Sequence, residues 1–462
     1  MKNKEEPSCA SRRGSKSRCP EPGSTAAASH EKPALSLFPE TLMEAVVDAA
    51  NMERAWKQVR GNGGAPGPDA ITLAKFPEWV RPGWPAIRQQ LLDGTYQPAA
   101  VRRKIIDKPG GGQRQLGIPN VLDRLIQQAI LQVLTPEFDP GFSGSSYGFR
   151  PKRSAHGAAK QVQRTIRRGY RFVVDMDLSK FFDRVQHDVL MSRIGRKVDD
   201  KRLLKLIGRY LRAGVMVEGI LQASSEGTPQ GGPLSPLLAN ILLDDLDKEL
   251  ERRGLPFVRY ADDFVIFTRT QRSAERVFAS VQCYLTKVLR LVVNQEKSRI
   301  VSTDGIEFLG FVFRGRRATI NVTEKNIQRF KTRIRELTGR SRGISMERRL
   351  ADLKRYVRGW MGYFALASQL KLFDHFDQWI RRRIRMCYWK RWRHVRTRIR
   401  ELVALGVSRR QAIRHGKSRK GYWRMSKTIA SGVGLTNAWL QAKGLLSLKT
   451  LWAQLAPLRR TA

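Results

Sequence analysis

The residues of this sequence that are best placed to do chemistry are acidic, and they stand beside apolar segments. Asp177 lies in the stretch RFVVDMDL, and Asp262 and Asp263 form a doublet between PFVRYA and FVIFTR. Two adjacent carboxylates repel each other unless a cation neutralises them. Three carboxylates from neighbouring strands would suit a pair of Mg²⁺ ions about 3.5–4 Å apart, the arrangement used for in-line phosphoryl transfer. An isolated Asp doublet can also be a solvated turn, so the surrounding sequence has to decide.

The apolar segments predict the elements that position these carboxylates. PFVRYA and FVIFTR predict the two strands of a hairpin with Asp262 and Asp263 at its tip. RFVVDMDL predicts a further strand, in which a period of two places Asp175 and Asp177 on one face. Residues 98–119 predict two short strands around a glycine triplet. These patterns indicate α+β architecture rather than a wound parallel sheet.

Helical patterns replace the strand signals beyond about residue 320. Each pattern has an apolar stripe opposite a basic one, so that one face can pack while the other faces phosphate. The segments are NIQRFKTRIRELTG, MERRLADLKRYVRGWMGYF and FDHFDQWIRRRIRMCYWKRWRHVRTRIRELVALG. A similar amphipathic pattern, LMEAVVDAANMERAWKQV, predicts a helix near the start of the chain.

The net charge points to a polyanionic partner. The 462 residues include 86 Lys and Arg against 41 Asp and Glu, a formal charge of +45, and such a surface attracts nucleic-acid phosphate. Residues 311–462 contain 38 of the basic residues but only 7 of the acidic ones. In RRRIRMCYWKRWRHVRTRIR, Tyr388, Trp389 and Trp392 are interleaved for packing or stacking. The predicted phosphate contacts in this segment are Arg381, Arg382, Arg383, Arg385, Lys390, Arg391 and Arg393.

Composition also limits the class of protein. A hydrophobic fraction of 41% is enough for packed cores and excludes a wholly disordered basic chain. No run approaches the ~18 apolar residues of a membrane span, and we expect a cytoplasmic protein without membrane contacts. The four cysteines are too scattered for a disulfide framework or a zinc site. Residues 1–38 predict a disordered basic leader.

The order of the motifs resembles that of the reverse transcriptases encoded by bacterial group II introns. FVVDMDLSKFFD resembles their first catalytic block, GTPQGGPLSPLLANILLDDLD the glycine-rich block, and YADD the metal-binding hairpin. RKIIDKPGGGQRQLGIPNVLDRLIQQAI and SYGFRPKRSAHGA resemble fingers blocks of the same enzymes. The resemblance implies a right-hand polymerase fold with fingers and palm over residues 39–318. A thumb or maturase domain would follow over 319–400, and a DNA-binding tail over 401–462.

The resemblance also implies roles for single residues. Asp177, Asp262 and Asp263 would hold two Mg²⁺ ions, for which Mn²⁺ could substitute. Asp177 is preferred to Asp175, because the family's ligand precedes the second aromatic residue by five positions and Phe182 stands there. Phe182 would exclude the ribonucleotide 2′-OH, although an ordinary core Phe is the alternative. The remaining implied roles are triphosphate binding by Lys108 and Arg114, a place for Gln230 under the nascent base pair, and proton donation to pyrophosphate by Lys297.

The partners implied by the resemblance are intron RNA, an RNA template with a DNA primer, target DNA and dNTPs. We expect the compact type that lacks a metal-dependent endonuclease domain, because no cluster of His and paired Cys follows the basic helices. Two alternatives remain open at this point. They are a noncatalytic RNA-splicing or chaperone protein, which the intact aspartates disfavour, and a domesticated reverse transcriptase in phage defence.

Overall fold

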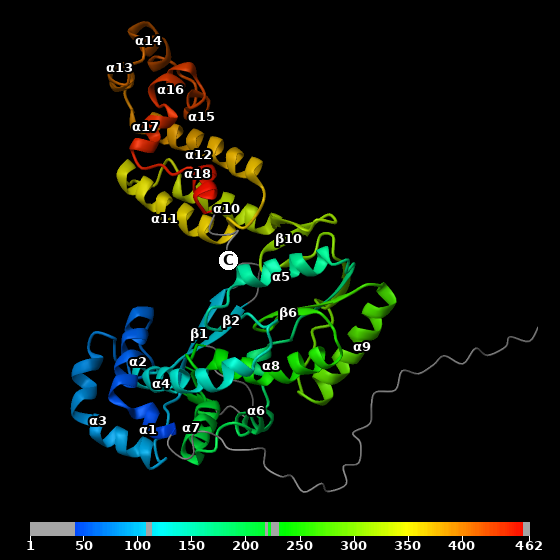
Figure 1. The fold of residues 1–462 in the computed structure, drawn as a ribbon. Coiled ribbons are helices and arrows are strands. Elements are labelled where there is room, and N and C mark those ends of the chain that lie inside the picture. The colour runs from blue at the N-terminus through cyan, green and yellow to red at the C-terminus, as the bar shows by residue number, and fades with distance from the viewer. Residues whose placement is uncertain (1–41, 108–112, 218–219, 223–230, 456–462) are drawn as a thin grey trace, which may run out of the picture. The chain divides into compact units, whose positions relative to one another are not determined.

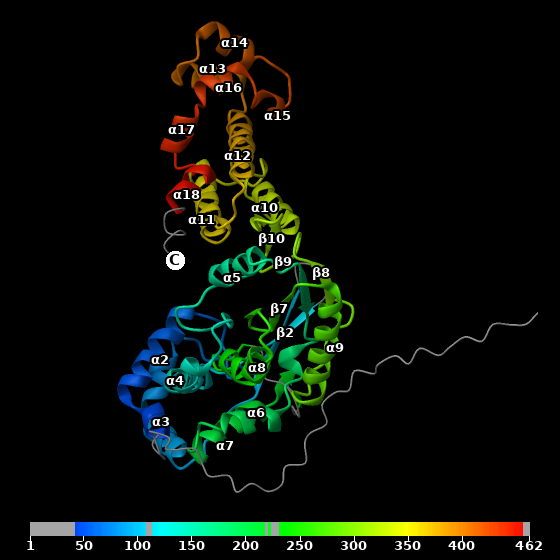
Figure 2. The same ribbon diagram turned by 45° about the vertical axis from the view of Figure 1, so that its right-hand side comes forward.

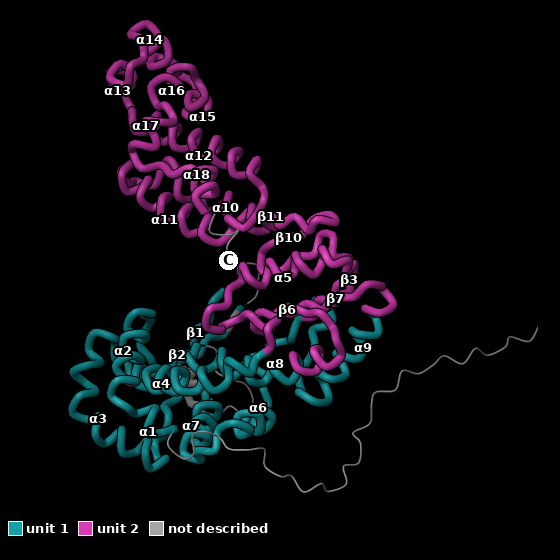
Figure 3. Tube along the Cα trace, in the orientation of Figure 1, with its two compact units in different colours: residues 1–142, 177–246, 275–298 teal, residues 143–176, 247–274, 299–462 magenta. Residues whose placement is uncertain are grey.

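The computed structural model describes residues 42–107, 113–217, 220–222 and 231–455 and has the predicted α+β architecture (Figure 1). The predicted leader, residues 1–38, lies outside this range. The chain divides into two compact units (Figure 3). Unit 1 comprises residues 1–142, 177–246 and 275–298, and unit 2 comprises residues 143–176, 247–274 and 299–462. The predicted domains follow one another along the chain, whereas the two compact units are interleaved in sequence.

Unit 1 is built around a four-stranded sheet of order β2-β1-β4-β5. β1 (Val101–Asp107) and β2 (Gln113–Ile118) are the two short strands predicted around the glycine triplet, and they pair antiparallel. β4 (Val215–Val217) pairs parallel with β1, and β5 (Ile220–Gln222) follows it. The helices of this unit are α1 (Leu42–Val47), α2 (Ala49–Asn62), α3 (Phe76–Leu92), α4 (Val121–Phe138), α6 (His187–Ile194), α7 (Lys201–Arg212) and most of α8 (Ser235–Arg252) and α9 (Gln271–Lys287).

The helix predicted near the start of the chain is divided into α1 and α2. The Asp48 carboxylate accepts a hydrogen bond from the backbone N–H of Asn51, 3.1 Å away, and so caps the N-terminus of α2. An Asp at this position satisfies an N–H group that has no partner within the helix. The amphipathic pattern therefore located the helical segment correctly but missed the break within it.

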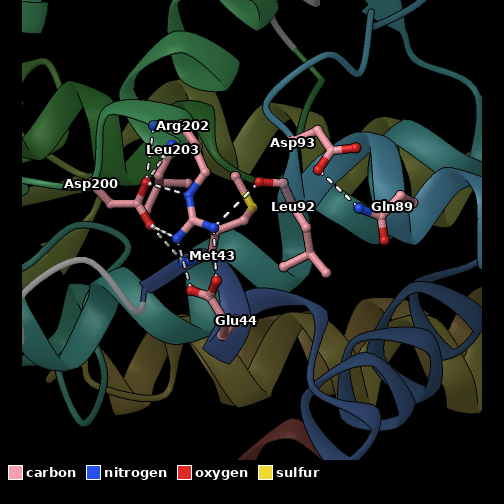
Figure 4. Close-up of polar contacts among 8 residues, drawn as sticks. All are labelled: Met43, Glu44, Gln89, Leu92, Asp93, Asp200, Arg202 and Leu203. Carbon is pink, nitrogen blue, oxygen red and sulfur yellow. Dashed lines mark hydrogen bonds and ion pairs between the residues drawn. The ribbon is translucent and has the colours of Figure 1, made fainter.

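Charged side chains tie α1 to α7 within unit 1 (Figure 4). The Arg202 guanidinium donates to Glu44 at 2.7 and 2.8 Å and to the buried carboxylate of Asp200 at 3.1 Å. Asp200 also accepts the backbone N–H of Met43 at 3.0 Å. The hydrogen bond from Arg202 lowers the pKa of Glu44. One guanidinium thus holds the start of α1 against the start of α7.

Unit 2 contains the predicted hairpin and the basic helices. β6 (Phe257–Tyr260) and β7 (Asp263–Thr268) form the hairpin, and with β3 (Phe172–Met176) and β8 (Arg299–Ser302) they make an antiparallel sheet of order β6-β7-β3-β8. A three-stranded sheet of order β11-β10-β9 follows. Its strands are β9 (Glu307–Phe308), β10 (Phe311–Arg314) and β11 (Thr319–Val322). The principal helices are α5 (Ala155–Arg167), α10 (Glu324–Leu337), α11 (Met346–Phe364), α12 (Leu370–Arg391) and α13 (Val395–Ala404).

Shorter helices complete the C-terminal part of unit 2. They are α14 (Arg409–Gly416), α15 (Tyr422–Met425), α16 (Ile429–Gly434), α17 (Asn437–Ala442) and α18 (Leu448–Leu455). Figures 1 and 2 show α13 to α16 gathered beyond the C-terminal end of α12. The aromatic side chains of α10, α11 and α12 form one core, in which Phe330 lies 4.4 Å from Trp360 and 4.8 Å from Phe376, measured between ring centroids. The prediction that strands give way to helices near residue 320 is confirmed.

No helix within the described ranges has the length and apolar character needed to cross a membrane.

A buried carboxyl group lies among the helices of unit 1. The side chain of Asp123, on α4, is 2% exposed and accepts hydrogen bonds from the hydroxyls of Tyr96, at 2.9 Å, and Tyr210, at 3.2 Å. Burial raises the pKa of Asp123 to about 6, although the two hydroxyls and the backbone N–H of Ala99 act in the opposite direction. The charged form of this group is therefore disfavoured in the folded protein.

This raised pKa predicts a stability that depends on pH. Between about pH 4 and 6 the unfolded chain loses the Asp123 proton first, so the free energy of unfolding should fall as pH rises, by up to about 3 kcal/mol. Asp123→Asn cannot titrate and should lack this component. Urea denaturation of both proteins at pH 4, 5, 6 and 7 measures the difference, and parallel pH profiles would contradict the assignment.

Candidate active site and nucleic-acid interface

The carboxylate doublet lies where it was predicted, at the turn between β6 and β7. Tyr260 pairs with Asp263, so that Ala261 and Asp262 form a two-residue turn, and Ala261 has a φ of 58°, in the left-handed region. Asp263 is exposed and Asp262 is half-buried, whereas the remaining five residues of β7 are buried. The apolar strand anchors the hairpin, and its end carries the two carboxylates.

The two candidates for the first carboxylate have different surroundings. Asp175 lies within β3, and its Oδ2 is 3.5 Å from Nε of Arg299 on the adjacent strand β8. β3 ends at Met176, opposite Phe264 of β7, and Asp177 is the next residue of the chain. Asp175 is therefore paired across the sheet, whereas Asp177 stands just beyond the end of the strand.

Asp177 and Lys297, which the resemblance assigned to the same reaction, lie together in unit 1. Nζ of Lys297 is 3.6 Å from Oδ2 of Asp177, and the same oxygen accepts a hydrogen bond from the side-chain amide of Asn294 at 3.2 Å. The backbone N–H of Asp177 donates to Ser298 Oγ, and its carbonyl accepts the backbone N–H of Asn294. The loop from Asn294 to Ser298 therefore fixes both the backbone and the side chain of Asp177.

The three predicted metal ligands are divided between the two compact units. Asp177 belongs to unit 1, and Asp262 and Asp263 belong to unit 2. Over the ranges that the structure describes, no three or more His, Cys, Asp or Glu side chains form a cluster that could hold a metal ion. The donor chemistry nevertheless suits Mg²⁺, which prefers carboxylate oxygens to nitrogen or sulfur. Metal ligation by these aspartates stays a prediction.

Of the adjacent residues Phe181 and Phe182, only Phe181 is buried in the core. It lies in a short 3-10 helix (η2, Phe181–Asp183), with its ring 5.1 Å from that of Phe181 in an edge-to-face arrangement. Phe181 is 3% exposed and supplies the core contact, whereas Phe182 is half-buried. This arrangement favours the predicted gate over the alternative of an ordinary core Phe.

The remaining predicted nucleotide contacts are only partly within the described residues. Lys108 and Gln230 lie outside them, and Arg114 is described by its backbone alone, on β2 opposite Ile106. Gly231, directly after Gln230, has a φ of 132°, and a Cβ there would lie 2.3 Å from the carbonyl oxygen of Gly117 on β2. The glycine-rich loop therefore approaches β2 at a distance that only glycine allows.

Sequence reasoning missed a buried ion pair behind the carboxylate turn. Arg259, on β6, and Asp247, on α8, are both 0% exposed, and their side chains form hydrogen bonds of 2.5 to 3.0 Å. An arginine is rarely buried without a partner. Its position among the apolar residues of PFVRYA was the signal that could have revealed it, because the strand pattern gave this residue a core-facing environment.

The predicted phosphate contacts on α12 fall into two groups. Arg382, Arg383 and Arg385 are half-buried and hold neighbouring segments. The guanidinium of Arg382 lies 3.9 Å from the ring centroid of Trp423, Arg383 donates to Thr338 and to the carbonyl of Arg335, and Arg385 donates to the carbonyl of Leu435 and to Asn437. Burial lowers the pKa of Arg383 and of Arg385. Phosphate binding by these arginines is untested, but each has an internal structural contact.

Most of the other predicted phosphate contacts are more exposed to solvent. Lys390, Arg391 and Arg393 are exposed, at the C-terminal end of α12 and just beyond it, and Arg381 is half-buried. Arg391 is 3.5 Å from Glu347. Tyr388, Trp389 and Trp392 are 7%, 1% and 5% exposed, so these rings pack in the core and are not available to stack on bases. The exposed cations therefore form the better candidate for a nucleic-acid contact.

Comparison with known proteins gives two family matches in chain order. Residues 106–313 match the family "Reverse transcriptase (RNA-dependent DNA polymerase)", and residues 327–404 match the family "Group II intron, maturase-specific domain". The first match runs from the last two residues of β1 to most of β10 and includes the β6–β7 turn, and the second covers most of α10 through α13.

The chain is also similar to individual proteins. The chain is 34% identical to Protein YkfC of Escherichia coli (strain K12), over 53% of this chain and 74% of that protein. It is 31% identical to the Group II intron-encoded protein LtrA of Lactococcus lactis subsp. cremoris, over 50% of this chain and only half of that protein. Among solved structures, it is similar to a chain of a partial Cas6-RT-Cas1--Cas2 complex, with 27% identity, a TM-score of 0.35, and coverage of 53% of this chain and 42% of that one.

The two groups of cations on and near α12 predict different mutant behaviour. Arg393→Ala should weaken binding to an RNA–DNA duplex and lower the slope of log K against log[salt] by about one, since each lost phosphate contact releases about one counterion less. Thermal stability should not change. Arg385→Ala should instead destabilise the C-terminal helices by about 1–3 kcal/mol, because the Leu435 carbonyl loses its donor.

Filter binding over a KCl series and thermal denaturation of the two variants provide the measurements. An unchanged salt slope for Arg393→Ala would show that this side chain does not contact phosphate.

Proposed function

This chain belongs to the family of group II intron reverse transcriptases and maturases, and we propose that it extends a primer 3′-hydroxyl on an RNA template with dNTPs and binds intron RNA during splicing and retrohoming. Its reverse transcriptase domain is of the RNA-dependent DNA polymerase type, and its maturase-specific domain follows in the same chain. The intact carboxylate doublet at the β6–β7 turn carries the proposal of catalysis, because an RNA-binding role alone would not require it.

The proposed cofactor is Mg²⁺, with Mn²⁺ as a substitute, held by Asp177, Asp262 and Asp263. When bound, two such ions would activate the attacking hydroxyl and stabilise the charge on the leaving pyrophosphate. Aspartate oxygens just beyond the end of β3 and at the turn of the β6–β7 hairpin in the same sheet are ligands of the right chemistry for this role.

The chain's own residues supply the rest of the proposed mechanism. Lys297 would give a proton to the pyrophosphate oxygen that leaves, and its exposed ammonium beside Asp177 supports this role. Phe182 would block the 2′-OH of a ribonucleotide by steric exclusion. Lys108 and Arg114 would bind the triphosphate, where the planar guanidinium can make paired hydrogen bonds. Gln230 would lie below the nascent base pair, and it directly precedes Gly231, which lies close to β2.

The basic helices support the proposed nucleic-acid partners. α10 to α13 belong to the region that matches the maturase-specific family, and exposed cations at the end of α12 provide contacts that do not depend on base sequence. Intron RNA, the template with its primer and the target DNA all present such phosphates. We place the protein in the cytoplasm, where an intron RNA and its DNA target would both be within reach.

The metal assignment predicts a contrast between neighbouring aspartates. Asp262→Asn and Asp177→Asn should each lower the rate of primer extension on an RNA template by at least about 10²-fold, because charge stabilisation in the transition state is lost. Asp175→Asn is the matched control, since Asp175 is paired with Arg299 and should leave most activity intact. Extension assays with purified protein, dNTPs and Mg²⁺ measure all three.

Two outcomes would count against the proposal. Full activity in Asp262→Asn would overturn the metal assignment. A wild-type protein that promotes intron splicing but gives no product with any primed template would favour the noncatalytic splicing protein.

The gate assignment predicts a loss of sugar discrimination. Phe182→Val should reduce the preference for dNTPs over rNTPs, measured as the ratio of their kcat/KM values, by about 10–200-fold, the range that steric pockets achieve. Single-nucleotide incorporation with dATP and ATP opposite the same template base gives this ratio. A ratio equal to that of the wild type would assign Phe182 to packing alone.

A further inference from the structure

The β6–β7 turn, Ala261 and Asp262, packs against a segment that precedes it by more than 100 residues in the sequence. β6 is an edge strand of its sheet. Residues 145–147 run along that open edge, where the backbone N–H of Arg259 donates to the carbonyl of Ser145 at 2.9 Å and the N–H of Tyr147 donates to the carbonyl of Arg259 at 2.8 Å. Ser146 and Arg259 form a parallel bridge. This segment thus satisfies the backbone of β6 immediately before the turn.

Gly148 brings the same segment into direct contact with the turn. A Cβ atom at Gly148 would lie 2.3 Å from the backbone nitrogen of Ala261 and 2.9 Å from the carbonyl carbon of Tyr260. Real Cβ atoms do not approach backbone so closely, so any other residue would push the two segments apart. Both neighbours of this contact are conformationally restricted, since Phe149 and Ala261 have φ values of 56° and 58°. Non-glycine residues hold such backbone only where their surroundings enforce it.

The buried guanidinium of Arg259 holds the turn from a second direction. Its Nε and Nη2 bind the carboxylate of Asp247, and its Nη1 donates to the carbonyl oxygen of Ala261 at 3.0 Å. Asp247 lies on α8, so one side chain joins a long helix to the residue that immediately precedes Asp262. A buried charge that lacks a partner is costly, which fixes the guanidinium in this position.

We propose that Gly148 and Arg259 are positioning residues that set the backbone of the Ala261–Asp262 turn and thereby place the carboxylates that bind the divalent cation. This inference rests on the function proposed above. Gly148 limits how far the turn can move toward residues 145–149, and Arg259 limits how the Ala261 peptide can rotate. Neither residue touches substrate. Their effect reaches the reaction through the cation, so they should alter metal affinity more than primer–template affinity.

The chain offers a matched control in the same segment. A Cβ atom at Gly144 would meet no atom within 4 Å, and its backbone is not in the left-handed region, so Gly144→Ala makes the same chemical change without the steric conflict. Gly148→Ala should raise the Mg²⁺ concentration for half-maximal primer extension by about 10–100-fold, the usual effect of losing support behind a metal ligand. Gly144→Ala should match the wild type, and both variants should keep the wild-type KM for primer–template.

A second readout does not depend on activity. Fe²⁺ in place of Mg²⁺, with ascorbate and oxygen, generates hydroxyl radicals that cut the backbone next to the bound ion, and mass spectrometry locates the cut. The wild type and Gly144→Ala should be cut at residues 260–264. At the same Fe²⁺ concentration Gly148→Ala should be cut there at least about 10-fold less, because its metal affinity is lower.

Arg259→Lys keeps the proposal testable if Gly148→Ala fails to fold. Lysine retains the charge beside Asp247, but a single ammonium cannot replace a planar fork that binds Asp247 and Ala261 together. Its Mg²⁺ requirement and Fe²⁺ cutting should change as for Gly148→Ala. Arg253→Lys is the control, since Arg253 forms an ion pair with Glu249 on α8.

The outcomes separate this inference from the function on which it rests. A wild type that neither extends a primer nor is cut at residues 260–264 would refute the proposed function itself. A wild type that does both, with folded Gly148→Ala and Arg259→Lys proteins that match it in Mg²⁺ requirement and cutting, would overturn the positioning role alone. Lower activity with unchanged Mg²⁺ requirement and unchanged cutting would overturn it as well.

Discussion

Two neighbouring carboxylates at the end of a hairpin repel each other, and the surrounding part of unit 2 is arranged so that they nevertheless stay in one place. The buried strand β7 anchors one side of the turn, and the Arg259–Asp247 ion pair fixes the other. The guanidinium of Arg259 donates hydrogen bonds to the carboxylate of Asp247 and to the carbonyl oxygen of Ala261. The backbone of the turn is thus held in one conformation, as a cation-binding turn requires.

In the basic helices, too, charged side chains serve as internal structural contacts. A formal charge of +45 suggests a surface devoted to phosphate, yet Arg382 and Arg385 hold the C-terminal helices onto α12, and Arg383 holds the end of α10. Arginine suits this double use, because its long aliphatic stem can be buried while its fork binds carbonyl groups. Only part of the excess charge is therefore available to nucleic acid, and the exposed cations at the C-terminal end of α12 belong to that part.

Local patterns in the sequence predicted the helices and strands well, but they could not predict contacts between residues that are far apart in the chain. The helix over 346–364 and the hairpin around Asp262 follow from periodicity and apolar runs, which are properties of adjacent residues. The break at Asp48 was missed because a capping side chain competes with helix continuation, and periodicity does not register that competition. The contact of Gly148 with Ala261 joins segments 113 residues apart, and no local rule relates them. The interleaving of the two units could not be predicted for the same reason, since β3, β7 and β8 come from separate parts of the chain.

The two candidates for the first metal ligand, Asp175 and Asp177, can be compared by their positions on the strand and by their partners. The resemblance favoured Asp177, through its spacing from Phe182, and a period of two left Asp175 on the same face of the strand. Arg299 lies across the sheet from Asp175 on the paired strand β8, 3.5 Å away, and its side chain is 58% exposed. The partner of Asp177 is a lysine whose side chain is 66% exposed and 3.6 Å away, so water and salt weaken both pairings. The two aspartates therefore differ chiefly in that Asp175 lies within β3 and Asp177 lies just beyond its end. A cation bound at Asp177, as proposed above, would leave the Lys297 ammonium beside it, where the proposed reaction needs a proton donor for the departing pyrophosphate.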